Sequence, residues 1–254
     1  MRIAIGIAVV AVGSLFVPIV HAEEGAHHWS YSGHGGPAHW AELEKDYGVC
    51  GLGKTQSPID IRDTAVKKAA LPTIAFDYKP SPLSIIDNGH TIQVNYGPGS
   101  FITVDAKRYE LVQFHFHKPS EEKINGKSSD MVAHLVHKDA EGHLAVVAVL
   151  LKKSAQPNKL VDTLWQNVPS AKEKETAVQG VQIDATDLLP ANKAAYYTFT
   201  GSLTTPPCSE GVTWFVLKTP TLVSGHEVTQ FGKLYAMNAR PTQPLNGREI
   251  RGTP

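Results

Sequence analysis

Residues 113–117 read Gln113-Phe114-His115-Phe116-His117, an alternation of polar and aromatic side chains. A period of two is typical of a β-strand, in which residues i and i+2 point to the same face. His115 and His117 are therefore expected to project together, with Phe114 and Phe116 buried behind them. Two imidazoles on one face of a rigid strand form a preformed chelate, although a His-x-His pair is more often two ordinary histidines.

A third ligand could come from a neighbouring strand, because a catalytic zinc ion takes three protein ligands and keeps one position open. Residues 131–137 read Met-Val-Ala-His-Leu-Val-His and offer His134 and His137. His134 lies in the middle of an apolar run, where an imidazole without partners for its ring nitrogens costs stability. That position favours His134 as a ligand over an ordinary core histidine.

Strand signals dominate the rest of the chain. Alternating or unbroken apolar runs between turn residues predict strands over 85–86, 91–96, 101–104, 111–117, 131–137, 144–151 and 214–217. Two short helices are predicted over 158–167 and 224–235, the second with Ser224 and Glu227 as a capping box. No repeat or linker divides the chain. We therefore predict an α+β, mainly β, single domain with a large twisted, mostly antiparallel central β-sheet and short peripheral helices.

Charge and composition exclude some classes of partner. The chain has 24 basic and 24 acidic residues, and loss of an N-terminal leader containing Arg2 leaves one more acidic than basic residue. The sequence therefore has no excess of positive charge that would indicate binding to nucleic acid or to an anionic membrane.

The N-terminus has the pattern of a signal peptide. Arg2 precedes an apolar run over 3–17, and Val20-His21-Ala22 provides a small-residue cleavage site. A membrane anchor is the alternative, but the run is short for a span. We expect residues 1–22 to be removed, residues 23–254 to form the catalytic domain, and the product to be periplasmic or secreted, with no membrane attachment.

Two cysteines, Cys50 and Cys208, are present. In an exported chain an even pair is expected to form a disulfide, the alternative being two unpaired thiols. The closed loop is long, so the chain-entropy model gives an upper expectation of about 4–5 kcal/mol of stabilisation.

Several motifs resemble those of the α-class carbonic anhydrases, in particular the bacterial periplasmic members. They run in family order from about Trp29 to Arg248, nearly the whole mature chain. The segments that carry the resemblance are Trp29-x-Tyr31, Gly36-Pro37-x-His39-Trp40, residues 56–61 (Gln-Ser-Pro-Ile-Asp-Ile), Asn88-Gly89-His90, Gln-Phe-His-Phe-His at 113–117 with Ser120-Glu121, Ala-His-Leu-Val-His at 133–137, residues 201–211 and residues 240–248.

The resemblance implies zinc-dependent, reversible hydration of carbon dioxide to bicarbonate and a proton by attack of zinc-bound hydroxide. His115, His117 and His134 would bind Zn²⁺, and water would take the fourth position. Thr204 would accept the hydroxide's hydrogen bond and donate its own hydrogen to Glu121. His90 would pass the proton to buffer, since imidazole titrates in the right range.

The resemblance also implies a substrate site with two different walls. The apolar wall for carbon dioxide would contain Val136, Val146, Leu203, Val212 and Trp214, with Thr205 beside Thr204. The opposite, polar wall would contain Tyr31, Asn88, His90 and Gln93. For the apolar residues, simple core packing is the competing interpretation, and the Thr-Thr-Pro-Pro segment at 204–207 is also expected as a turn with a cis Pro206–Pro207 bond.

Zinc-binding histidines need an acceptor for their second ring nitrogen. Gln113 is expected to serve His115, and the Asn238 backbone to serve His117. For His134 the family normally places a glutamate two residues earlier, where this chain has Val132. The expectation is therefore weaker zinc retention, with a water or backbone carbonyl in the missing role. Glu122 also departs from the family pattern, where a histidine commonly follows Glu121.

Three alternative functions remain open. The first is a catalytically weak carbonic anhydrase-like binding protein, which Val132 alone favours. The second is a zinc esterase or other hydrolase, although the chain has no His-Glu-x-x-His motif. The third is periplasmic zinc storage, for which a single rigid site is poorly suited. Bacterial relatives are often dimers, so a homodimer is expected; bicarbonate supply and pH control are both open as physiological roles.

Overall fold

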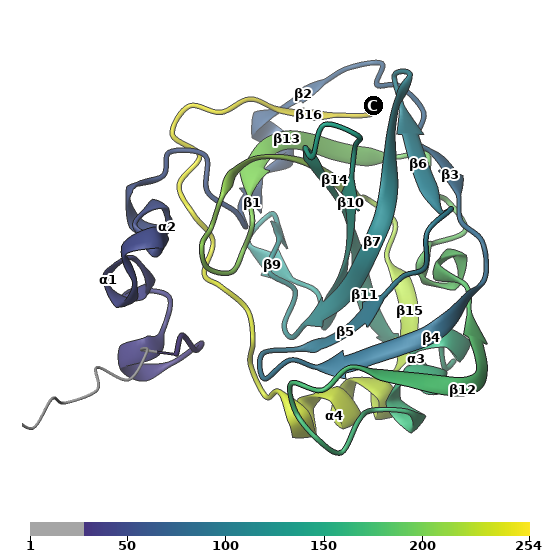
Figure 1. Ribbon diagram of the computed structural model, residues 1–254. Coiled ribbons are helices and arrows are strands. Elements are labelled where there is room, and N and C mark those ends of the chain that lie inside the picture. The colour runs from purple at the N-terminus through teal and green to yellow at the C-terminus, as the bar shows by residue number, and fades with distance from the viewer. Residues whose placement is uncertain (1–27) are drawn as a thin grey trace, which may run out of the picture.

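The computed structural model describes residues 28–254, and a 13-stranded mixed sheet forms its centre. Figure 1 shows this sheet twisting through the molecule, with the helices on its outside. The main path of neighbouring strands is β12 (Thr176–Ile183), β4 (Ser81–Asp87), β5 (Ile92–Asn95), β7 (Lys107–His117), β10 (Met131–Lys138), β11 (Leu144–Ser154), β14 (Glu210–Leu217), β13 (Tyr196–Ser202), β16 (Ile250–Gly252) and β2 (Val66–Lys68). Most pairs are antiparallel, which confirms the predicted fold class.

The remaining strands extend the sheet or lie beside it. β15 (Thr221–Ser224) pairs with β11, while β6 (Phe101–Val104) pairs with β7 and with β3 (Ala75–Asp77). A separate small sheet contains β1 (Asp60–Ile61), β8 (Lys123–Ile124) and β9 (Lys127–Ser128). β8 follows directly on Glu122, so this small sheet fixes the chain next to the histidine cluster.

The four α-helices within residues 28–254 are short and peripheral, as predicted. They are α1 (Trp40–Leu43), α2 (Val49–Leu52), α3 (Lys159–Gln166) and α4 (Gly225–Leu234). Short 3₁₀ turns occur at Gly33–Gly35, Lys45–Tyr47, Asp63–Ala65 and Ala185–Leu188. The Asn158 side chain accepts from the N–H groups of Leu160 and Val161 and so caps α3, an interaction that typically contributes about 1 kcal/mol. Ser224 and Glu227 form the predicted capping box at α4. Both helices lie together at one end of the sheet (Figure 1).

The two faces of β7, and likewise of β10, meet different surroundings. In β7, Phe114 and Phe116 are fully buried in the core that α3 and α4 cover. The alternation of a strand sends His115 and His117 to the opposite face. In β10 the same parity places Val132, His134 and Val136 away from that core, two of them in a second apolar cluster. The central sheet thus separates a helix-covered core from the face that bears the histidines.

The predicted disulfide joins Cys50 to Cys208 across 158 positions of sequence. It connects the segment of α2 to the loop that carries Thr204 and Thr205. Arg240 braces the same region, because its guanidinium donates to the carbonyl oxygens of Cys50 and Ser57 at 2.9 and 2.8 Å. The Pro206–Pro207 peptide is cis, as predicted.

The expected signal peptide, residues 1–22, lies outside the described residues. Among residues 28–254, the structure contains no helix of the length and apolar character that crossing a membrane requires.

Candidate metal centre and active site

Three imidazoles converge on the open face of β7 and β10. Antiparallel pairing sets His134 directly opposite His115, and His117 follows two residues along the same face. One ligand nitrogen of each ring lies within 4.8 Å of those of the other two. His117 and His134 are each 1% exposed, while His115 is partly exposed, so the cluster opens to solvent on the side of His115.

The hydrogen bonds of the three rings determine which nitrogens remain free. His115 Nδ1 lies 2.8 Å from Gln113 Oε1, and His117 Nδ1 lies 2.8 Å from the Asn238 carbonyl oxygen. Their Nε2 atoms are therefore available to a metal, and Nε2 of His117 is buried with no hydrogen-bond partner in the described part of the chain. Gln113 and Asn238 thus lie where the sequence predicted them.

The expectation that His134 lacks an acceptor is wrong. His134 Nε2 lies 3.0 and 3.2 Å from the two carboxylate oxygens of Glu122, which leaves Nδ1 free. Val132 is indeed buried and apolar, but a loop residue supplies the acceptor in place of the strand. The available donors are therefore Nε2, Nε2 and Nδ1, three imidazole nitrogens of the kind that hold zinc.

Burial sets the protonation of the cluster. It lowers the pKa of His115 to about 3, with a contribution from His134, and it lowers that of His117 well below the ordinary value. Burial also acts to lower the pKa of His134, but the carboxylates of Glu122 and Glu121 outweigh it and leave that pKa raised. Neutral imidazoles are the form that binds metal, so the lowered pKa values of His115 and His117 favour metal binding, whereas a metal at His134 must compete with a proton.

Glu121 lies beside the cluster and points toward the Thr204 loop. Its Oε1 accepts from the Arg240 backbone N–H at 2.8 Å, while its Oε2 is buried and has no hydrogen-bond partner among residues 28–254. Burial raises the pKa of Glu121 to about 7, although contact with the Thr204 hydroxyl lowers it. Thr204 itself is 5% exposed. A carboxylate with one free oxygen therefore faces a buried hydroxyl at the edge of the metal site.

The residues predicted for the carbon dioxide wall come together. Val136 faces Val146 across β10 and β11, and Val146 faces Trp214 across β11 and β14. Val212 belongs to the same buried cluster, and Leu203 packs against it. The Trp214 ring makes an edge contact with His134, with the ring centroids 4.9 Å apart. An apolar wall thus begins at His134 itself.

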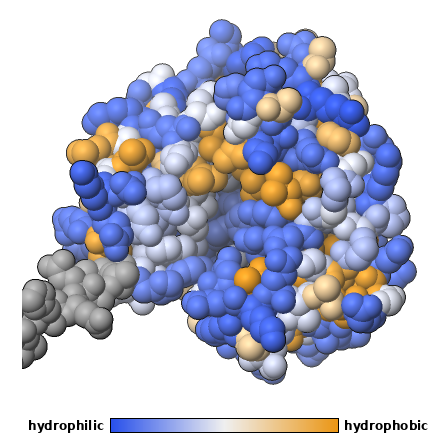
Figure 2. Space-filling view, viewed as in Figure 1, coloured by the Kyte–Doolittle hydropathy of each residue, from blue (hydrophilic) through white to orange (hydrophobic). Residues whose placement is uncertain are grey.

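Three residues predicted for the polar wall lie on the β5 side of His115, away from the apolar wall. Gln93 lies opposite His115 in the pairing of β5 with β7. Asn88 and His90 lie in the turn before β5, where the His90 N–H donates to the Asn88 side chain. His90 stacks on Trp29, with the ring centroids 3.5 Å apart. Figure 2 shows one face of the molecule hollowed near its centre, with hydrophobic residues gathered along one side of the hollow and hydrophilic residues along the other.

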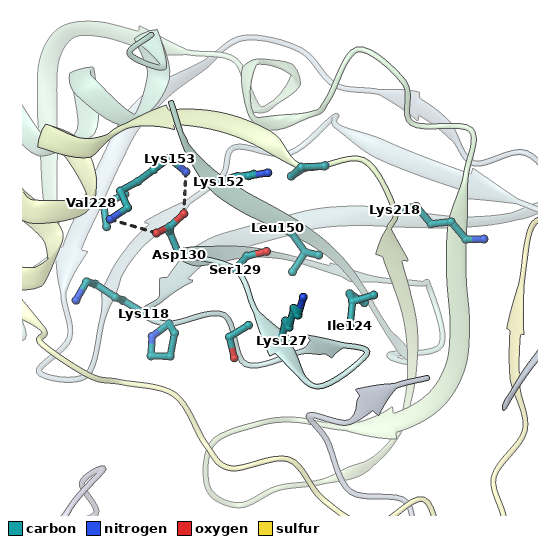
Figure 3. Close-up of a pocket in the computed structure, with 13 residues that line it drawn as sticks. Lys118, Ile124, Lys127, Ser129, Asp130, Leu150, Lys152, Lys153, Lys218 and Val228 are labelled. Carbon is teal, nitrogen blue, oxygen red and sulfur yellow. Dashed lines mark hydrogen bonds and ion pairs between the residues drawn. The ribbon is translucent and has the colours of Figure 1, made fainter. Parts of the chain in front are cut away.

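Two of the remaining histidines lie elsewhere. His137 is fully buried on the other face of β10, where its Nε2 contacts the Tyr78 hydroxyl at 2.8 Å. His143 is exposed in the β10–β11 turn beside Asp139 and Glu141. A pocket of about 710 Å³ is also separate from the cluster. Figure 3 shows its lysine-rich lining, in which Asp130 pairs with Lys153. The three clustered histidines do not line it.

The family model for eukaryotic-type carbonic anhydrases matches residues 35–253. The chain belongs to the α-carbonic anhydrase family. Its activity is therefore the one that defines the family, the reversible hydration of carbon dioxide to bicarbonate.

Similar proteins cover nearly the whole domain. A carbonic anhydrase from Klebsiella pneumoniae is 45% identical over 228 residues, which are 89% of this chain and 91% of that one. A carbonic anhydrase from Nostoc sp. is 41% identical over 225 residues, 87% of this chain and 84% of that one. The α-carbonic anhydrase of Thermovibrio ammonificans, solved with sulfanilamide, superposes with a TM-score of 0.84 at 42% identity, covering 89% of this chain and 100% of that one.

The sequence did not predict the contact of Glu122 with His134. The residue lies in an irregular segment between β7 and β8, where the alternation of a strand no longer tells which way a side chain points. The sequence signal for this contact was the combination of two adjacent glutamates, Glu121 and Glu122, with an apolar residue at position 132. That signal indicates a displaced carboxylate only once the loop is known to fold against β10.

Proposed function

We propose that this carbonic anhydrase acts with one zinc ion held by Nε2 of His115, Nε2 of His117 and Nδ1 of His134. The observation that carries the proposal is the pattern of hydrogen bonds made by the three imidazole rings. In each ring one nitrogen is hydrogen-bonded to Gln113, to Asn238 or to Glu122, and the other is left for a metal. Zinc in such a His₃ site lowers the pKa of a water ligand to about 7, as is established for carbonic anhydrases.

Glu121 and Thr204 orient the attacking oxygen. Oε1 of Glu121 already accepts from the Arg240 N–H. Oε2 is therefore the oxygen that is left to accept a hydrogen bond from the Thr204 hydroxyl. A hydroxyl that donates to Glu121 can only accept from the nucleophile. The nucleophile then turns its lone pair away from Thr204 and toward the apolar wall, where carbon dioxide would lie.

The apolar wall binds the substrate and excludes competing water. Carbon dioxide has no hydrogen-bond donor and no net charge, so Val136, Val146, Leu203, Val212 and Trp214 can contact it without loss of polar interactions. Bicarbonate, by contrast, is charged and is disfavoured in apolar surroundings. The same wall therefore supports substrate entry and product release, with Thr205 at its edge.

His90 is proposed to carry the released proton from the site to buffer. The prediction is that His90→Ala slows turnover in weak buffer by about 10- to 100-fold, near or below the lower end of the usual range for acid–base catalysis. Burial, with neighbouring His28, lowers the pKa of His90 to about 4. The ring is therefore neutral at pH 7, but its pKa lies below the range that suits a proton shuttle, so the proposal rests on its position and not on its pKa. Stopped-flow turnover with and without added imidazole checks this; an unchanged rate in weak buffer contradicts the role.

We also propose export to the periplasm, directed by residues 1–22. The Cys50–Cys208 disulfide supports this location, since such bonds persist in oxidising compartments. A homodimer stays a prediction.

A stopped-flow carbon dioxide hydration assay with and without a strong zinc chelator tests the proposed function. The expected result is hydration far above the buffer rate, lost on chelation and regained with zinc. Chelator-insensitive hydration would contradict the metal site. Hydrolysis of an activated ester without hydration above the buffer rate would instead indicate a zinc esterase, and neither activity would indicate a binding protein.

A further inference from the structure

A second buried carboxylate faces the metal-ligand cluster beside Glu121. Glu122 is 0% exposed, and its two oxygens lie 3.0 and 3.2 Å from the same nitrogen, His134 Nε2. A carboxylate only accepts, so Nε2 carries the hydrogen and Nδ1 of the neutral ring carries the lone pair. This contact therefore determines both the tautomer and the orientation of His134.

The surroundings of Glu122 offer its charge no other compensation. Within residues 28–254 its carboxylate forms no ion pair with a lysine or an arginine, and its side-chain hydrogen bonds go to His134. A buried carboxylate that loses its partner is strongly destabilised. A glutamate at this position is therefore explained by His134 and by what His134 binds, and not by packing.

The backbone that presents Glu122 is held on both sides. The Ser120 hydroxyl donates to the Glu122 carbonyl oxygen at 2.8 Å and accepts from the Ser129 N–H at 2.8 Å. Lys123, the next residue, begins β8 and donates its N–H to the Ile59 carbonyl oxygen at 3.2 Å. The carboxylate thus approaches His134 from a fixed backbone, as the orientation of a metal ligand requires.

β10 itself supplies no such acceptor. Val132 precedes His134 by two residues, shares its strand face, and is 0% exposed in an apolar cluster with Val136. We propose that Glu122 is the positioning residue of the metal ligand His134, holding Nε2–H so that Nδ1 faces the metal and slowing metal loss. The inference rests on the zinc site proposed above.

Glu122→Ala and Glu122→Gln test the proposal through the rate at which zinc passes to an excess of chromogenic chelator. Loss of an outer acceptor typically weakens metal binding about 10- to 100-fold, so we expect zinc loss from Glu122→Ala to accelerate in that range. Glu122→Gln keeps the shape and one acceptor oxygen but not the charge, and should accelerate zinc loss by a smaller factor. Wild-type rates in both variants would overturn the proposal.

Moving the acceptor provides a second, independent test. The double variant Glu122→Ala/Val132→Glu places a carboxylate two residues before His134 on the same strand face, and should restore slow zinc loss. Val132→Glu alone puts two buried carboxylates beside one imidazole, so it should not slow zinc loss and should lower the thermal stability of the metal-free protein. Slower loss in Val132→Glu alone would contradict the proposal, because it would mean that His134 still needed an acceptor.

Glu227→Gln is the matched control, because Glu227 is also buried, at 1% exposure, and accepts hydrogen bonds at the start of α4. It should change stability without changing zinc loss. If wild-type protein fails to bind zinc, the proposed function fails; if wild-type protein binds one zinc and the Glu122 variants retain it equally well, only the present inference fails. If Glu122→Ala does not fold, Glu122→Gln decides.

Discussion

His117→Ala is expected to abolish zinc binding and, with it, carbon dioxide hydration. His117 is 1% exposed, its Nδ1 is held 2.8 Å from the Asn238 carbonyl oxygen, and its Nε2 has no partner in the described chain. Alanine leaves two donors where a catalytic zinc ion needs three. A catalytic metal supplies several kcal/mol of transition-state stabilisation, so its removal is expected to lower kcat/KM by about 10³-fold or more.

Zinc content by elemental analysis and hydration by stopped flow measure the two effects together. His226→Ala is a matched control, since it removes an exposed imidazole at the start of α4 that belongs to neither group of possible metal ligands, and it should leave both quantities unchanged. An His117→Ala protein that keeps one zinc per chain and near-normal hydration would refute the assignment of this ligand.

Thr204→Val is the second substitution with a large expected effect. Valine matches threonine in shape but has no hydroxyl, so Oε2 of Glu121 loses the group that would donate to it, and the nucleophile loses its acceptor. Removing one oriented group at a catalytic centre typically costs about 10²- to 10³-fold, and we expect kcat/KM for hydration to fall by about 10²-fold. Zinc content should not change, which separates this effect from loss of a ligand.

Thr205→Val serves as the control for Thr204→Val. Thr205 is the next residue, is only partly buried, and lies at the edge of the proposed substrate wall. Its substitution should reduce kcat/KM much less. Equal losses in the two variants would mean that the loop as a whole, and not the Thr204 hydroxyl, supports the reaction.

Much of this site follows from strand periodicity. The alternation of histidine and phenylalanine over 114–117 and the unbroken apolar run over 131–137 predicted β7 and β10, and both exist. Their pairing could not be derived in the same way, because period-two patterns fix faces and not neighbours. Only the register that sets His134 opposite His115 brings a third imidazole to the pair on β7.

Segments with weak periodicity were not predicted. β12 (Thr176–Ile183) contains Gly180 at a φ of +74°, and its register with β4 shifts between Ala177 and Gln182. Such an irregular strand has no clean period of two for a sequence pattern to reveal. Glu122 shows the same limit at the site. Its side chain matters because a loop folds against β10, and the direction of a loop side chain depends on contacts that are distant in the sequence.

Titrating zinc into the metal-free protein while following the rate of carbon dioxide hydration tests the central claim most directly. A single His₃ site predicts a rate that rises linearly and stops rising at one zinc per chain, with the His117→Ala protein flat throughout. Hydration that is already present without zinc, or that continues to rise well beyond one equivalent, would contradict the account.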